Sequence, residues 1–189
     1  VRSAYPGKKI VFSLGRLVAY KGFGYLVEAA RYLSDDYVVL IGGAGPLEQE
    51  LNSHIQVWGL ENKVKLLGRI SDEEVMSHYG ACSVFCLSSV FKTEAFGIVQ
   101  IEAMSCGKPI VATRIPGSGV AWVNEHKVSG LNVDPKDAKQ LAESIMAIAE
   151  DEDAYKVFCE GAEQRYRDLF TKEKMIGNLQ EIYSKLWKK

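Results

Sequence analysis

The sequence predicts an α/β protein in which a parallel sheet is covered by helices on both faces. Short apolar runs alternate along the chain with segments whose apolar residues recur at helical spacing. The first run, KIVFSL, stops at Gly15 and is expected to be a buried strand. Regular alternation of strand and helix indicates strand–helix–strand units, which build parallel sheets.

Six apolar runs are expected to form the strands. The second of them, YVVLI, ends in a loop with glycines at positions 42, 43 and 45, and the third is shorter. The fourth is SVFCL. The predicted strands cover residues 9–14, 37–41, 64–67, 83–87, 110–112 and 131–133.

Helices are expected between the strands, and several have end signals. Ser71 and Glu74 have the spacing of a capping box. Pro46 and Pro135 are each expected in the first turn of a helix. A cap-like Thr171 divides the last helical stretch. The predicted helices cover residues 23–33, 46–58, 72 onward, 95–105 and everything after 135.

With right-handed crossovers these elements give a doubly wound, Rossmann-like sheet. In such sheets ligands bind beyond the carboxyl ends of the strands, at helix N-termini. Every unusual loop of this chain follows a strand, so all of them are expected along one edge of the sheet. The loops in question cover residues 15–22, 42–46, 68–71, 88–95 and 113–120.

Composition fits one soluble domain. The chain has 189 residues, 47% of them hydrophobic and 25% charged, and we expect one domain with a helical extension from about residue 151. The net charge of −1 gives no sign of a nucleic-acid partner. No apolar run approaches the roughly 20 residues that span a bilayer. Because the chain starts abruptly at Val1 and lacks an initial Met, we expect it to be a piece of a longer protein.

The four cysteines do not form a metal site. Cys82 and Cys86 lie in a predicted strand, and no second Cys/His pair completes a zinc site. Cys106 and Cys159 are isolated. We expect four free thiols, which suits a reducing, cytoplasmic compartment.

Two glycine-containing loops are candidates for binding anions. Arg16 and Lys21 stand among glycines directly after the first strand, where they either bind phosphate or are solvated surface cations. The loop at 42–46 is either an anion nest or a place of close backbone approach. It is not a dinucleotide fingerprint, because Glu48 stands where the third glycine belongs, and no Walker A lysine occurs.

Glu94 and Glu102 are separated by seven residues. If both lay on one helix, the eight steps between them would rise about 12 Å, too far for the carboxylate pair of a retaining glycosidase. They would suit hydroxyl groups at two ends of an extended ligand such as a nucleoside diphosphate sugar. The backbone N–H groups of Phe96, Gly97 and Ile98 would then face its diphosphate. The alternative is a helix with two exposed glutamates.

The whole set of motifs, in this order, resembles the donor-binding domain of retaining glycosyltransferases of family 4, the C-terminal half of the two-domain GT-B fold. The resemblance covers nearly the whole chain, and the segment at 116–123 is most similar to bacterial surface-polysaccharide mannosyltransferases and related enzymes. The motifs that carry it are GR…KG at 15–22, GGAGP at 42–46, LGR at 67–69, the run from Glu94 to Glu102 followed by AMSCGKPIVAT, and GLNV at 130–133.

The resemblance implies a role for each site residue. Arg16 and Lys21, after Gly15, neutralise the donor diphosphate, and with Glu94 they form the expected catalytic group. Glu102 binds the ribose hydroxyls. The remaining roles belong to the backbone: Phe96, Gly97 and Ile98 hold sugar and phosphate, while Arg69 and Ile70 contact the base.

The resemblance also implies the reaction and the partners. A glycosyl unit passes from a UDP- or GDP-sugar to a glycan, lipid-linked or polysaccharide acceptor, with retention at the anomeric carbon and without a metal or other cofactor. The acceptor binds an N-terminal domain that is absent here, so we expect this piece alone to be inactive. The family allows the full-length enzyme to associate with the inner face of the membrane, and its last helix often returns to the other domain, as Trp187 would suit.

Two other classes compete with this interpretation. A nucleotide-sugar epimerase would need a dinucleotide fingerprint and a Tyr-x-x-x-Lys pair, and neither occurs in a matching place. A non-catalytic scaffold domain predicts loss of the charged site residues, yet Arg16, Lys21, Glu94 and Glu102 are all present. Ser88 and Ser89 lie in a site loop without a recognisable base and receive no role.

Overall fold

A computed structural model describes residues 1–187 and contains one six-stranded sheet. Every pair of neighbouring strands is parallel, and the strand order is β3-β2-β1-β4-β5-β6. This is the order of a doubly wound fold, so the predicted fold class is confirmed. The strands are β1 (Lys9–Leu14), β2 (Tyr37–Gly42), β3 (Val64–Gly68), β4 (Val84–Leu87), β5 (Ile110–Thr113) and β6 (Gly130–Val133).

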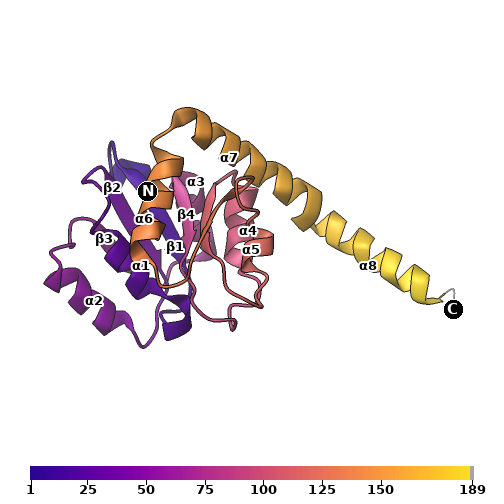
Figure 1. Ribbon diagram of the computed structural model, residues 1–189, viewed down its shortest axis with the longest axis horizontal. Helices are drawn as coiled ribbons and strands as arrows, with labels where there is room; N and C mark the ends of the chain where they lie inside the picture. Colours follow the sequence, from indigo (N-terminus) through magenta and orange to yellow (C-terminus); the bar gives the residue numbers. More distant parts are fainter. Residues whose placement is uncertain (188–189) are drawn as a thin grey trace.

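Helices cover both faces of the sheet (Figure 1). One face packs against α1 (Phe23–Ala29), α2 (Glu48–Val57) and α6 (Ala138–Ala149). The other face packs against α3 (Asp72–Ala81), α4 (Ile98–Ser105) and α5 (Val120–Val123). Successive residues of each strand point to opposite faces, so the strands need apolar residues at nearly every position.

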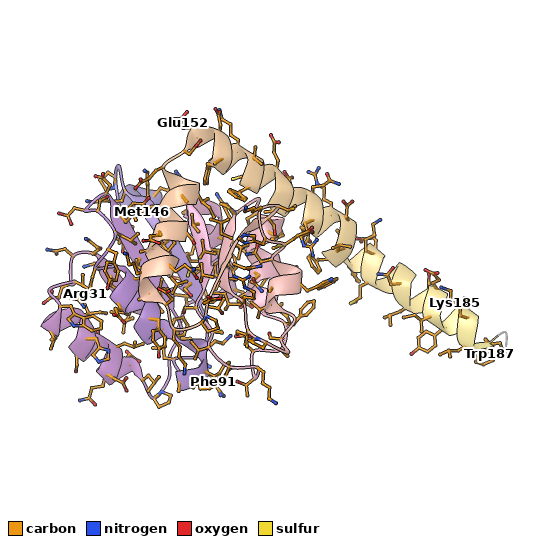
Figure 2. All side chains as sticks on the ribbon, viewed as in Figure 1. Arg31, Phe91, Met146, Glu152, Lys185 and Trp187 are labelled. Atoms are coloured by element: carbon orange, nitrogen blue, oxygen red, sulfur yellow. The ribbon has the colours of Figure 1, made fainter. Side chains whose placement is uncertain are left out.

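The C-terminal part of the chain has two different environments. Helix α7 (Glu152–Arg165) packs on the domain, where Ala162 is fully buried, and a π-helical turn η3 (Tyr166–Phe170) follows it. Helix α8 (Lys172–Trp187) extends away from the sheet, and every residue in it is exposed (Figures 1 and 2). Thr171 accepts a hydrogen bond from the Lys174 N–H at 3.3 Å, so the predicted division of this stretch is confirmed. The exposed apolar residues of α8 recur every three or four positions: Met175, Ile176, Leu179, Ile182, Tyr183 and Leu186.

Helix starts agree with the sequence where a side chain caps the helix. Ser71 and Glu74 form the predicted capping box, in which the Ser71 N–H donates to Glu74 Oε2 at 2.8 Å. That hydrogen bond holds the pKa of Glu74 below its usual range. Helix α6 is capped by Asp137, whose carboxylate accepts from the Gln140 N–H at 2.8 Å. The expected start at Pro135 was wrong, because Lys136 adopts a positive φ and interrupts the helix.

Other boundaries also differ from the sequence prediction. Helix α1 stops at Ala29 instead of residue 33, and α2 starts at Glu48, so Pro46 precedes it. Helix α4 starts at Ile98 instead of residue 95, because Gly97 has a φ of +72° and ends the preceding loop. Helix α5 was not predicted, since four residues are too few to show helical periodicity. Short 3-10 turns also occur as η1 (Arg2–Ala4) and η2 (Ala19–Lys21).

Two buried thiols, Cys86 in β4 and Cys82 just before it, give a direct test of this packing. Burial raises the pKa of Cys82 and of Cys86 to about 12 each, whereas Cys106 and Cys159 are only half buried. Since the thiolate is the reactive form, we expect a disulfide reagent at about pH 8 to modify at most two thiols in the folded chain. Adding denaturant should expose the other two, and Cys106→Ser should remove one reactive thiol. Rapid modification of all four thiols without denaturant would contradict the fold.

Candidate functional site

The loops after β1 and β4 meet at the place where the strand order changes direction. β1 and β4 are neighbours, with β2 and β3 on one side and β5 and β6 on the other. Helices leave the sheet in opposite directions at such a switch point, which opens a crevice beyond the strand ends. The loop 15–22 follows β1 and the loop 88–97 follows β4, so both predicted catalytic segments border this crevice.

A buried ion pair connects the two loops. Lys21 Nζ lies 2.5 Å from Glu94 Oε2, and the two side chains are only 11% and 10% exposed. The same carboxylate oxygen accepts a hydrogen bond from Ser89 Oγ at 2.8 Å. Both groups have lost most of their water, so each depends on the other for compensation. The structure therefore brings together two of the three predicted catalytic residues.

The backbone fixes the position of Lys21. Lys21 closes η2, and Gly22 follows with a φ of +66°, where a Cβ atom would lie 2.1 Å from the Ser88 carbonyl oxygen. Ser88 Oγ donates to the Lys21 carbonyl at 3.0 Å, and the Val90 N–H donates to the Tyr20 carbonyl at 2.8 Å. Only glycine permits this approach, which locks the two loops together.

The glycine-rich loop after β2, residues 42–46, is a place of close backbone approach. A Cβ atom on Gly43 would lie 1.9 Å from the Gly15 carbonyl oxygen. The Gly43 N–H already donates to the Gly68 carbonyl at 2.7 Å, and the Leu17 N–H donates to the Ala44 carbonyl at 3.1 Å. This loop is therefore a place of close backbone approach that supports the first loop.

A cavity of about 330 Å³ lies beside the first loop. Four of the predicted site residues line it: Gly15, Arg16, Arg69 and Ile70. Arg16 and Arg69 are exposed, and within residues 1–187 neither guanidinium has an ion-pair or hydrogen-bond partner. Lys21 lies close to one lining residue, since its Cε is 3.2 Å from the position of a Cβ on Gly15. Two unpaired cations at a cavity mouth suit an anionic ligand.

Glu102 is held by Tyr79, which is not among the site residues predicted from the sequence. Tyr79 in α3 is fully buried, and its hydroxyl donates to Glu102 Oε2 in α4 at 2.7 Å. Burial and the neighbouring carboxylate raise the pKa of Tyr79. A tyrosine on an apolar face was itself the available signal, because a buried phenol needs a polar partner.

The remaining predicted residues lie beyond this cavity. Glu94 and Glu102 do not share a helix, because α4 starts at Ile98, so the 12 Å estimate does not apply. Glu94 belongs to the preceding loop. The ring of Phe96 packs against Trp122 and Phe170, with centroids 5.9 and 6.3 Å apart, and is still 37% exposed. Ile98 is 65% exposed.

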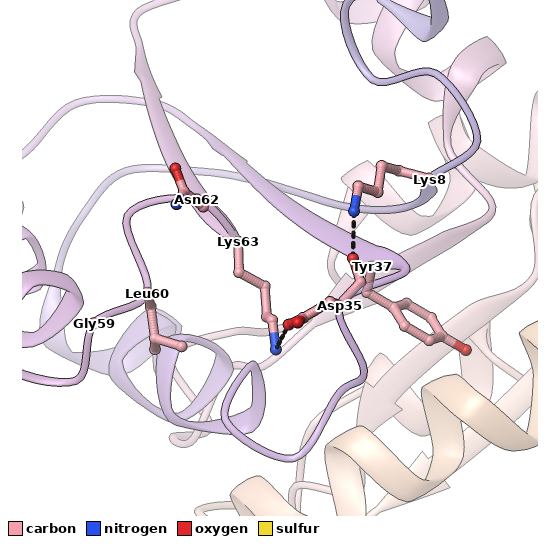
Figure 3. A pocket seen from close by; sticks show the side chains of 7 residues that line it. All are labelled: Lys8, Asp35, Tyr37, Gly59, Leu60, Asn62 and Lys63. Atoms are coloured by element: carbon pink, nitrogen blue, oxygen red, sulfur yellow. Dashed lines mark hydrogen bonds and ion pairs between the residues drawn. The ribbon is translucent and has the colours of Figure 1, made fainter.

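A second cavity, of about 430 Å³, lies at the opposite edge of the sheet, where the strands begin (Figure 3). Its two lysines are already engaged: Lys8 donates to the Asp35 carbonyl, and Lys63 lies 3.1 Å from the Asp35 carboxylate. This cavity therefore lacks the unpaired cations of the first. Among residues 1–187 no three His, Cys, Asp or Glu side chains gather in a metal-binding cluster. No helix within residues 1–187 is both long enough and apolar enough to cross a membrane.

The sequence matches one protein family over most of its length. Residues 2–165 match the family described as Glycosyl transferases group 1. The chain belongs to this family. The match includes both loops at the switch point, the capping box of α3 and the whole of α4, so the resemblance seen in the sequence is confirmed.

Two curated relatives of this glycosyl transferase chain are a bacterial mannosyltransferase and a bacterial rhamnosyltransferase. It is 31% identical to O-antigen chain mannosyltransferase C of Escherichia coli over 180 residues, which cover 95% of this chain and 47% of the relative. It is 33% identical to D-rhamnosyltransferase WbpZ of Pseudomonas aeruginosa over 165 residues, which cover 87% of this chain and 42% of the relative. The chain thus spans about half the length of the curated relatives it matches.

A solved structure shares the fold of this glycosyl transferase chain. Anabaena Alr3699/HepE, crystallised in complex with UDP, superimposes with a TM-score of 0.87 at 27% identity, covering 97% of this chain and 50% of that one. A second structure of the same protein holds UDP-glucose and gives a TM-score of 0.85. The predicted GT-B half is therefore confirmed as the fold.

The Tyr79–Glu102 hydrogen bond predicts how stability depends on alkaline pH. A raised folded-state pKa contributes stability below the unfolded value of about 10, and this contribution falls by about 1.4 kcal/mol per pH unit above it. Tyr37, Tyr79 and Tyr155 all have raised pKa values because they are buried. We expect Tyr79→Phe to lose stability less steeply than the wild-type chain in urea unfolding above pH 10.

The matched control is Tyr37→Phe. The Tyr37 hydroxyl also donates to a carboxylate, that of Glu150, at a distance of 3.1 Å, and this pair lies outside the site. It should reduce the alkaline slope by a similar amount. An unchanged slope in Tyr79→Phe, beside a reduced slope in Tyr37→Phe, would show that the Tyr79 hydroxyl is not buried against Glu102.

Proposed function

We propose that this chain binds the nucleoside diphosphate sugar donor of a glycosyltransferase that retains the configuration of the transferred sugar. The observation that carries the proposal is the Lys21–Glu94 pair at the β1/β4 switch point, beside a cavity lined by two arginines that are unpaired within residues 1–187. Names of the relatives support sugar transfer, and the complexes of Alr3699/HepE support a uridine diphosphate sugar as one form of donor.

In the proposed complex the diphosphate takes Lys21 Nζ away from Glu94. Lys21 and Arg16 then neutralise the phosphates, and the freed Glu94 carboxylate accepts hydrogen bonds from sugar hydroxyls. The N-terminus of α4 adds N–H groups and a positive dipole end. Donor binding thus exchanges one buried partner for another: phosphate replaces Glu94 beside Lys21, and hydroxyl donors replace Lys21 beside the Glu94 carboxylate.

The proposed reaction breaks the bond between the anomeric carbon and a diphosphate oxygen, with both electrons leaving on that oxygen. Negative charge develops there, where Arg16 and Lys21 would stabilise it, and positive charge develops on the sugar ring. The acceptor hydroxyl bonds to the anomeric carbon on the same face, which retains configuration. The departing oxygen on that face is the base placed to take its proton.

The other ends of the donor have candidate contacts. The cavity formed by Gly15, Arg16, Arg69 and Ile70 has room for a base, and the Glu102 carboxylate, oriented by Tyr79, would accept hydrogen bonds from ribose hydroxyls. UDP and GDP are both candidates for the nucleotide.

We propose that the other half of a longer protein binds the acceptor, a glycan or lipid-linked sugar. The relatives are about twice as long as the matched segment, which leaves room for such a domain. The exposed apolar face of α8 would dock on it. We further propose a cytoplasmic enzyme that works without a metal cofactor, associates with the inner face of the membrane, and is inactive as this piece alone.

The test is calorimetric titration of this chain with UDP, GDP and ADP. We expect one of the three to bind and Lys21→Met to weaken it at least about thirtyfold, because removing one member of a buried charge pair costs about 2 kcal/mol or more. Glu102→Gln should weaken the same ligand. Lys63→Met is the matched control, since Lys63 is 16% exposed and pairs with Asp35 at the opposite edge. Absence of binding at millimolar concentration, or equal losses in both lysine variants, would refute the proposal.

A further inference from the structure

Three consecutive backbone carbonyl groups of the loop after β4, those of residues 94, 95 and 96, accept hydrogen bonds from neighbouring segments. Ser118 Oγ donates to the Glu94 carbonyl, and the Gly119 N–H donates to the Ala95 carbonyl at 2.7 Å. The buried Gln100 side chain donates from Nε2 to the Phe96 carbonyl at 3.2 Å. These donors come from the loop after β5 and from the first turn of α4.

The hydroxyl of Ser118 is itself held in place. It accepts a hydrogen bond from the Val120 N–H at 3.2 Å while it donates to Glu94. Gln100 Nε2 also reaches the Val120 carbonyl at 3.5 Å. Ser118 and Gln100 thus connect the loop after β4 to the start of α5.

These contacts determine where the N–H groups of the loop point. In a trans peptide the C=O and the following N–H point in opposite directions. The Glu94 and Ala95 carbonyls accept from the loop after β5, so the N–H groups of Ala95 and Phe96 point away from that loop. The Phe96 carbonyl accepts from Gln100, so the Gly97 N–H points away from that side chain. Within residues 1–187 none of these three N–H groups has an acceptor. Lys21, on the loop after β1, contacts this segment through Glu94.

We propose that Ser118, assisted by Gln100, is a positioning residue that orients the peptide groups at 94–97 so that their N–H groups bind the donor's diphosphate. The inference rests on the proposed function of the site. Ser118 does not touch the donor; it acts through the Glu94 peptide. Without its hydroxyl that peptide is free to rotate, and the first N–H of the set is no longer directed at the anion.

The test compares Ser118→Ala with Ser118→Thr, which keeps a hydroxyl. Calorimetry with the diphosphate that this chain binds best among UDP, GDP and ADP is expected to show about tenfold weaker binding by Ser118→Ala, the effect of one hydrogen bond to a charged group. Ser118→Thr should bind within about twofold of the wild-type chain. Ser129→Ala is the matched control, because it removes another serine hydroxyl, which donates to Asn124 at 2.8 Å outside the loop.

Gln100→Met keeps the proposal testable if Ser118→Ala does not fold. It removes the donor to the Phe96 carbonyl together with a buried Oε1 that has no partner, so stability should change little. We expect a smaller loss of affinity, about threefold, in this variant. Rescue by threonine separates positioning from general destabilisation.

The outcomes separate this proposal from the proposed function. Binding by the wild-type chain with equal binding by Ser118→Ala and Gln100→Met would overturn the positioning role and leave the donor site standing. Loss of affinity in Ser118→Thr as large as in Ser118→Ala would also overturn it. Failure of the wild-type chain to bind any of the three diphosphates would overturn both.

Discussion

The ion pair between Lys21 and Glu94 is the interaction on which the arrangement of the site depends. It joins the loops that follow β1 and β4, and both charged groups are almost completely removed from water. Neither charge is stable there without a partner. Two serine hydroxyls add hydrogen bonds: Ser89 Oγ donates to the Glu94 carboxylate, and Ser88 Oγ donates to the backbone carbonyl of Lys21. The pair therefore holds the crevice in a defined shape before any ligand enters.

Backbone packing makes this pair possible. Gly22 passes so close to Ser88, and Gly43 so close to Gly15, that a side chain at either position would overlap a carbonyl oxygen. The loops after β1, β2 and β4 therefore form one packed layer above the sheet edge. Arg16 follows Gly15 in this layer, and its exposed guanidinium is unpaired within residues 1–187. Rigid backbone beneath unpaired cations is a suitable basis for an anion site.

Much of the fold could be predicted from the sequence, because each strand is a short apolar run and buried parallel strands require that pattern. The gathering of the site loops follows from parallel topology alone. Helix starts were less predictable. Gly97 and Lys136 have positive φ values that apolar periodicity does not reveal, and a proline marks a helix start only when the following backbone permits it. The hydrogen bonds of Ser89 and Ser118 could not be predicted, since neither serine belongs to a recognisable motif. For Tyr79 the only signal was a phenol on an apolar helix face, which does not identify Glu102 as its partner.

The central claim is that the crevice between β1 and β4 receives a nucleoside diphosphate. Amide chemical shifts of the nitrogen-15-labelled chain during titration with UDP and, in parallel, GDP test it most directly. The account predicts that the amides of 15–22 and 94–98 shift with one saturable curve, while those of Lys8, Asp35 and Lys63 at the opposite edge stay in place. Shifts that centre on the opposite edge, or that spread evenly over the surface, would contradict the account.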